Sequence, residues 1–321
     1  MFYLVTGGAG FIGSNIVAEL LRRNHKVRVI DNLSSGRMEN ISGFMDEIEF
    51  VDGDIRDFWT VEEAVKGVDY VLHQAALPSV IRSVRNPLTS NEVNITGTLN
   101  LLEAARKARV KKFVFASSSS VYGESESLPK KEEMTPAPLS PYANSKLASE
   151  NYCMIYDRLY DLPAVALRYF NIFGPRQDPS SQYSAVIPRF IHALLSGEQP
   201  IVYGDGLQSR DFTYVANAVD ANILAAETES VRGEVFNVAC GERFTLLELL
   251  EYLNEIIGTN IEAAFADERP GDIKHSLAQI SKAESLLGYN ISVNFKNGLK
   301  ETVTHFKNGT RKTIMADKND L

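Results

Sequence analysis

Residues 6–13 read Thr6-Gly7-Gly8-Ala9-Gly10-Phe11-Ile12-Gly13, and this stretch decides the fold of the chain. It follows an apolar run, 1–5, and leads into residues 14–21, whose apolar side chains have helical spacing. A strand, a glycine-rich turn and a helix in this order form a cradle for a pyrophosphate. The glycines let the backbone approach the phosphates, and the helix N-terminus supplies unpaired N–H groups and positive potential. We therefore expect a dinucleotide to bind at Gly7, Gly10, Phe11, Ile12 and Gly13.

Asp31 indicates which dinucleotide this is. It ends the next predicted strand, 27–30, and stands 18 residues after Gly13. A carboxylate at this place can accept hydrogen bonds from both ribose hydroxyls and would repel a 2′-phosphate. The sequence therefore predicts NAD rather than NADP.

Strand and helix patterns continue to alternate after Asp31. We expect strands at 48–51, 70–73, 112–116 and 164–168, and helices at 59–65, 91–108 and 143–160. This alternation predicts an α/β fold with a doubly wound parallel sheet and helices on both faces.

From Tyr169 onward, proline and glycine become more frequent and the periodic segments shorten, so we expect a smaller mixed α/β lobe. The lobe is interleaved, because 234–238 reads as another strand of the main sheet. We place the main domain at 1–168 plus about 217–242, and the lobe at 169–216 plus about 243–306. The polar tail, 307–321, is expected to be frayed.

Composition excludes several classes of function. The 321 residues carry a net charge of −8, which argues against a nucleic-acid or anionic-membrane surface. No apolar run approaches the ~20 residues of a membrane span, and the chain starts directly with a strand, so we expect no signal peptide. Cys153 and Cys240 form neither a metal-ligand spacing nor a disulfide framework. These features predict a cytoplasmic protein without a metal.

A reactive pair opens the predicted helix 143–160. Tyr142 and Lys146 stand four residues apart and share one helix face. A free phenol has a pKa of about 10. An ammonium about 4 Å away contributes on the order of 4 kcal/mol at an effective dielectric of 20, enough to lower that pKa by about 3 units. We therefore predict that Lys146 turns Tyr142 into a base. The alternative is a solvated helix face with a packed ring.

Serines 117–120 follow the predicted strand 112–116. Ligands of open parallel sheets bind at the carboxyl ends of the strands, which makes these hydroxyls candidate site groups. A polar loop that satisfies its own turn is the alternative interpretation.

Together these motifs resemble the extended short-chain dehydrogenases/reductases, and among them the UDP-hexose 4-epimerases. The resemblance extends to about Phe306. It is carried by the glycine-rich turn, Asp31-Asn32-Leu33, Gly53-Asp54-Ile55-Arg56, Val93-Asn94, the serine cluster, Tyr142 with Lys146, Arg168-Tyr169-Phe170-Asn171 and Arg269-Pro270-Gly271-Asp272.

The resemblance implies a Rossmann domain, a UDP-sugar substrate and a role for each matching residue. Lys146 holds the nicotinamide ribose as well as acting on Tyr142. The rest of the cofactor site comprises Asn32, Asp54, Ile55, Gln74, Ala75, Ala76 and Asn94. The substrate site comprises Ser118, Ser119, Tyr142, Asn171, Ala185, Val186, Tyr203, Arg210, Arg269, Asp272 and Ser276. Within it, Arg210 and Arg269 contact phosphates and Tyr203 lies against the uracil; a surface ion pair for each arginine and core packing for Tyr203 are the alternatives.

The residues before Tyr122 select the reaction within this resemblance. Dehydratases and decarboxylases of the superfamily carry a carboxylate there, whereas this chain has Ser118-Ser119-Ser120. What remains is 4-epimerisation, in which Tyr142 takes the O4 proton with help from Ser118. A dehydratase or decarboxylase with relocated acids, and a non-catalytic NAD-binding regulator, are the alternatives.

Ser276 bears on the sugar. Epimerases restricted to glucose and galactose carry a bulky Tyr at this place, so the small Ser276 predicts room for a 2-N-acetyl group. Segments 175–179 and 185–188 also resemble the branch that prefers UDP-GlcNAc. Pro78 departs from the Gly or Lys of some relatives, which leaves sugar contacts from its loop open.

The resemblance further implies a homodimer through the helices 91–108 and 143–160.

Overall fold

The structure is a computed structural model that describes residues 1–125, 127–178, 185–268 and 274–319, with the backbone only from 309 onward. Its centre is a seven-stranded sheet in which every pair of neighbours is parallel, in the order β11-β6-β5-β4-β1-β2-β3. The strands are β1 (Phe2–Thr6), β2 (Lys26–Asp31), β3 (Ile48–Asp52), β4 (Tyr70–His73), β5 (Lys112–Ser118), β6 (Ala164–Tyr169) and β11 (Glu234–Val238). The predicted doubly wound parallel sheet is confirmed.

Each face of this sheet has its own core, because successive side chains of a strand point to opposite faces. On β1, Tyr3 and Val5 pack into one core and Leu4 into the other, and all three are fully buried. The helices α1 (Phe11–Arg22) and α8 (Val215–Glu227) cover the first face. The second face is covered by α2 (Phe58–Val65), α5 (Gly97–Ala108) and α6 (Pro141–Tyr160). The apolar run of each strand is explained by this burial on both sides.

The predicted helix 91–108 is interrupted in the structure. After α3 (Val80–Arg85) and α4 (Pro87–Asn91), a π-helical turn, Glu92–Thr96, precedes α5. Such turns are wider than an α-helix and occur frequently at functional sites. Here the turn places the buried Asn94 beside α6, with Ser149 Oγ donating to its carbonyl oxygen at 2.8 Å.

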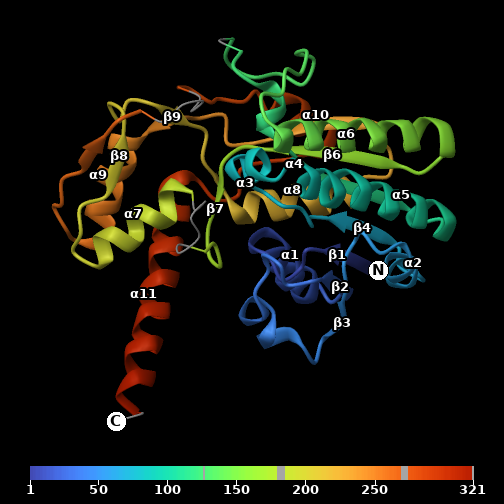
Figure 1. Cartoon of the computed structure of the whole chain (residues 1–321), viewed down its shortest axis with the longest axis horizontal. Helices are drawn as coiled ribbons and strands as arrows, with labels where there is room; N and C mark the ends of the chain where they lie inside the picture. Colours follow the sequence, from blue (N-terminus) through green and yellow to red (C-terminus); the bar gives the residue numbers. More distant parts are fainter. Residues whose placement is uncertain (126, 179–184, 269–273, 320–321) are drawn as a thin grey trace.

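The remaining elements form the smaller lobe. Its strands make three two-stranded sheets: β7 (Ile172–Phe173) with β10 (Thr213–Tyr214), β9 (Ser209–Arg210) with β12 (Phe244–Thr245), and β8 (Ile201–Tyr203) with β13 (Ala264–Ala266). Its helices are α7 (Val186–Leu195), α9 (Leu246–Ile257), α10 (Ser281–Leu287) and α11 (Phe295–Asn319). Phe295 stacks on Phe244 with ring centroids 4.3 Å apart. Figure 1 shows α7, α9 and β8 grouped at one end of the central sheet. The domain boundaries given above stay a proposal.

The structure continues α11 to Asn319, and the frayed tail expected at 307–321 stays a prediction. Phe295, Leu299 and Val303 are buried and anchor the first turns of this helix. In Figure 1 the end of α11 projects away from the lobe. Within the described ranges, no helix combines the length and the apolar character needed to cross a bilayer.

Candidate active site

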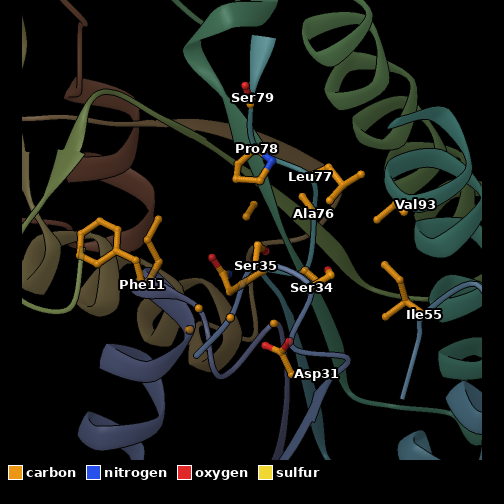
Figure 2. A pocket seen from close by; sticks show the side chains of 18 of the residues that line it. Phe11, Asp31, Ser34, Ser35, Ile55, Ala76, Leu77, Pro78, Ser79 and Val93 are labelled. Carbon is orange, nitrogen blue, oxygen red and sulfur yellow. The ribbon is translucent and has the colours of Figure 1, made fainter. Parts of the chain in front are cut away.

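The carboxyl ends of β1, β2, β4 and β5 open into one cavity of about 450 Å³. Figure 2 shows Asp31 and the Ser34–Ser35 loop facing this cavity from below and the loop 76–79 from above. The lining includes every residue that we assigned to the cofactor except Asn94: Gly7, Gly10, Phe11, Ile12, Gly13, Asp31, Asn32, Asp54, Ile55, Gln74, Ala75, Ala76, Tyr142 and Lys146. The structure therefore brings the predicted cofactor residues together.

The glycine-rich turn fits a dinucleotide because its backbone is too close-packed for side chains. A Cβ at Gly13 would lie 2.1 Å from the Gly7 carbonyl oxygen, and one at Gly7 would lie 2.7 Å from the Ala75 nitrogen. Gly7 also has a φ of +67°, a conformation that side chains disfavour. Gly10 caps α1 without a side-chain hydrogen bond. The helix N-terminus thus keeps N–H groups available for a phosphate.

Gly13→Ala tests this cradle. The added methyl group cannot coexist with the Gly7 carbonyl at 2.1 Å, so the turn or α1 must shift. We expect NAD binding to weaken at least about 100-fold, as several N–H contacts to the pyrophosphate are lost together. Titration calorimetry measures this. Gly43→Ala is the matched control, because a Cβ there meets nothing within 4 Å. Equal NAD affinity in the two variants would contradict this role of the turn.

Asp31 is held for ribose recognition at the end of β2. Its carboxylate is buried and accepts hydrogen bonds from the backbone N–H groups of Ala9 and Leu33, both at 2.9 Å. Burial raises the pKa of Asp31, while the two N–H groups counteract this by favouring the charged form. Each carboxylate oxygen keeps a lone pair for a ribose hydroxyl.

Asp54 lies at another point of the same cavity. It accepts hydrogen bonds from Asn32 Nδ2 at 2.9 Å and from Arg56 Nη2 at 2.7 Å. The hydrogen bond from Arg56 is the main reason why the pKa of Asp54 falls to about 2. The carboxylate is therefore ionised at neutral pH and available as an acceptor.

The catalytic pair is assembled by α6, but its electrostatics differ from the prediction. Lys146 Nζ donates to the Ala116 carbonyl at 2.7 Å, and burial lowers the pKa of Lys146 to about 7. We expected this ammonium to lower the pKa of Tyr142. That expectation is wrong for the described structure: burial raises the pKa of Tyr142, and the hydrogen bond with Ser118 is what lowers it. Burial destabilises the charged form of both groups, and neither pKa shift is caused by the other group.

The serine cluster divides into different roles. Ser118 Oγ accepts from the Ser120 N–H at 3.2 Å and caps the 3-10 turn Ser119–Tyr122. Ser117, the first of the candidate hydroxyls, lines the cavity. Its hydroxyl donates to Glu150 at 2.8 Å. Ser118 and Ser119 are not among the lining residues. Of these two serines, only Ser118 affects Tyr142, whose pKa it lowers.

Asn94 supports the cavity without lining it. Its side-chain oxygen accepts from the Leu77 N–H at 2.8 Å, and its Nδ2 donates to Ser145 Oγ at 2.9 Å. Asn94 therefore fastens the loop after β4 to α6.

A second cavity, of about 260 Å³, lies in the smaller lobe. It is lined by five of the predicted substrate residues: Asn171, Ala185, Val186, Tyr203 and Arg210. Ala185 lines the larger cavity as well, so one residue borders both. The Arg189 guanidinium lies 5.7 Å from the Tyr203 ring centre. A stacking ring and two cations are groups that suit a nucleoside diphosphate.

Besides Ser118 and Ser119, Ser276 is the one described substrate residue that lines neither cavity. Arg269 and Asp272 lie outside the described residues. The Ser276 N–H donates to the Ser209 carbonyl at 3.0 Å, which places this segment beside β9, but Ser276 lines neither cavity.

Sequence reasoning missed several lining residues. Ser34, Ser35, Gln177, Asp178 and Gln208 stand on loops, Arg82 stands in α3 and Arg189 in α7. Arg37 and Asp178 form an ion pair at 2.6 Å that joins the loop after β2 to the segment after β7. Only the position of these residues after strand ends could have indicated them. No cluster of three or more side chains suited to a metal ion occurs in the described part of the chain.

Comparison with known proteins agrees with this geometry. The model of the NAD dependent epimerase/dehydratase family matches residues 3–239. A curated UDP-glucose 4-epimerase of Mycolicibacterium smegmatis is 40% identical over 304 residues, which cover 94% of this chain and 96% of that protein.

Two solved structures cover 96% of this chain. One is a UDP-N-acetylglucosamine 4-epimerase from Methanobrevibacter ruminantium M1 in complex with UDP-N-acetylmuramic acid; its TM-score is 0.92, its identity 46%, and 98% of it is covered. The other is the Thermus thermophilus UDP-glucose 4-epimerase in complex with NAD, with a TM-score of 0.88, 41% identity and 99% covered. This chain therefore belongs to the NAD-dependent epimerase/dehydratase family of extended short-chain dehydrogenases/reductases, and the cofactor of its glycine-rich cradle is NAD.

Proposed function

We propose that the protein interconverts the C4 epimers of a UDP-hexose through a transient 4-keto sugar. One observation carries this proposal: Tyr142 lines the NAD cavity, the neighbouring Ser118 hydroxyl lowers its pKa, and positions 118–120 are all serine. The site thus holds a base for the O4 proton without the extra carboxylate that elimination of water or CO₂ requires. The 4-epimerases of M. smegmatis and T. thermophilus support the same reaction class.

Each residue has a defined task in this reaction. Tyr142 removes the proton from O4 and returns it later, and Ser118 stabilises the phenolate by donating a hydrogen bond to it. Lys146, anchored on the Ala116 carbonyl, holds the ribose next to the phenol. When bound, NAD would supply an acceptor and donor of hydride for C4 of the sugar. Arg210 and Arg189 in the smaller lobe hold the diphosphate while the sugar turns.

Product mass tests this proposal. The purified protein is incubated separately with UDP-Glc, UDP-GlcNAc and UDP-glucuronate without added cofactor. The products are separated by chromatography and their masses are measured. We expect a C4 epimer of unchanged mass. A dehydratase would remove water from the sugar, a decarboxylase would release CO₂ from a uronate substrate, and a regulator would leave the sugar unchanged. Any of these three results would overturn the proposal.

We further propose that the substrate range includes N-acetylated sugars. Ser276 has a small side chain, and its segment runs beside β9, which carries Arg210 of the smaller cavity. A 2-N-acetyl group needs free volume that a tyrosine at 276 would fill.

Ser276→Tyr should lower kcat/KM for UDP-GlcNAc at least about tenfold and change that for UDP-Glc much less, because overpacking penalises the larger sugar. The ratio of the two kcat/KM values is the measurement. Ser276→Ala is the control and keeps the volume small. Unchanged turnover of UDP-GlcNAc by Ser276→Tyr would show that this position does not set the sugar.

A homodimer and a cytoplasmic location stay predictions. For the dimer, α6 offers support: Ile155, Leu159 and Tyr160 are apolar or aromatic residues that α6 leaves exposed. Sedimentation velocity of the purified protein decides between monomer and dimer.

A further inference from the structure

His73, the last residue of β4, is buried in the centre of the main domain and is not used by the proposed reaction. Its Nδ1 lies 2.7 Å from Thr6 Oγ1, at the start of the glycine-rich turn. Its Nε2 lies 2.9 Å from Thr98 Oγ1 in α5. The ring packs against Phe113 and Phe115 of β5, so the side chain has no access to water. None of Thr6, His73 and Thr98 lines the NAD cavity.

The hydrogen bonds on either side of His73 fix its protons. Thr98 donates its only hydroxyl proton to the Asn94 carbonyl at 2.5 Å, so it must accept the proton of His73 Nε2. Nδ1 is then an acceptor, and the Thr6 hydroxyl donates to it. Thr6 Oγ1 in turn accepts from the Ala75 N–H at 3.1 Å. Burial lowers the pKa of His73 to about 3, which agrees with this neutral tautomer.

This chain of hydrogen bonds continues to the catalytic helix through Asn94. In the π-helical turn, the backbone carbonyl of Asn94 accepts the hydrogen bond from Thr98. The side-chain amide of Asn94 lies between Leu77 and Ser145. Ser145 Oγ then donates to the Tyr142 carbonyl at 2.8 Å. One end of this series of hydrogen bonds therefore holds the loop Gln74–Leu77, and its other end holds the first turn of α6. Both ends border the NAD cavity.

We propose that His73 is a positioning residue that, through Thr6 and Thr98, holds the loop after β4 and the Tyr142 end of α6 at the separation that NAD requires. A purely structural His73 would contribute to stability alone. A positioning role predicts that breaking the chain also weakens NAD binding, because the cofactor must then draw the two segments together itself. The inference depends on NAD binding and is independent of which sugar turns over.

The structure offers a matched pair of variants. Thr98 and Thr302 are both fully buried helical threonines, and each donates to the carbonyl four residues earlier, at 2.5 and 2.6 Å. Thr98 also accepts from His73, whereas Thr302 stands in α11, far along the chain from the NAD cavity. Thr98→Val leaves the Nε2 proton of His73 without an acceptor, and Thr302→Val loses only its local bond.

The measurements are the NAD dissociation constant by calorimetry on nucleotide-free protein and the melting temperature with and without NAD. We expect Thr98→Val to raise the dissociation constant about tenfold and Thr302→Val to leave it unchanged, although both lower the melting temperature. Thr98→Ser, which keeps the hydroxyl, should restore the affinity. Equal NAD affinity in both valine variants would overturn the proposal.

Two further arrangements keep the test decisive. Should Thr98→Val not fold, Thr6→Val breaks the same chain at its other end and is judged by the same affinity criterion. If the protein does not epimerise UDP-sugars but Thr98→Val still loses NAD affinity, the proposed function fails and the positioning role stands.

Discussion

Tyr142→Phe is expected to lower kcat about 1,000-fold while NAD still binds, since positioned general acid–base groups contribute about 10²- to 10⁴-fold. The variant keeps the ring that lines the cavity and removes the phenol oxygen whose pKa Ser118 lowers. Steady-state rates with UDP-Glc and UDP-GlcNAc, together with NAD titration, separate the loss of chemistry from a loss of cofactor.

Tyr160→Phe is the matched control for this experiment. Tyr160 ends the same helix, but it is half exposed and its ring packs beside Arg106 and Tyr156. Loss of the hydroxyl in Tyr160→Phe should leave kcat within about twofold of the value for the unaltered protein. If Tyr142→Phe retained the rate of Tyr160→Phe, the phenol would not be the base, and the proposed mechanism would fall.

Arg168→Met should destabilise the protein by about 3–5 kcal/mol. Arg168 and Glu150 are each only 4% exposed, and two hydrogen bonds, of 2.6 and 3.1 Å, join the guanidinium to the carboxylate. Removing the guanidinium leaves the Glu150 carboxylate in the interior without a cation beside it. The Ser117 hydroxyl still donates to this carboxylate. The free energy of unfolding, measured in urea, gives the size of the effect.

Arg232→Met tests whether burial is the cause. Arg232 also pairs with a carboxylate, Asp157, at 2.9 Å, but it is 40% exposed. Water screens such a pair, so we expect a cost below about 1 kcal/mol. The double variant Glu150→Leu with Arg168→Met should recover part of the stability, because it removes the orphaned charge as well. Similar losses for Arg168→Met and Arg232→Met would contradict the burial argument.

The central sheet could be predicted from the sequence because its signals are local. The strand expected at 70–73 coincides with β4, Tyr70–His73, and the strand expected at 234–238 coincides with β11. Each is a short apolar run between stretches of helical spacing. The π-helical turn Glu92–Thr96 could not be predicted in this way, since it depends on hydrogen bonds from Thr98 and Ser149 to the carbonyl of Asn94.

The candidate site shows the same division. The glycine turn and Asp31 were found from spacing alone, because their task constrains the backbone. The lowered pKa of Lys146 could not be found in this way, because it depends on burial of the side chain in the folded protein. In the fold, Lys146 Nζ also donates to the Ala116 carbonyl. Arg82 of α3 and the loop residue Gln177 reach the cavity only through the tertiary fold, and no periodicity marks them.

The late return of the chain to the central sheet constrains how such enzymes can diversify. β11 completes the sheet beside β6, yet part of the smaller lobe, from β7 to β10, lies between these two strands in the sequence. A recombination event between related genes that fell between residues 170 and 233 would pair one parent's β6 with the other parent's β11. Hybrids should therefore tolerate exchange of short loops far better than exchange of whole halves, and new sugar preferences are expected to arise by point changes around Ala185 and β9.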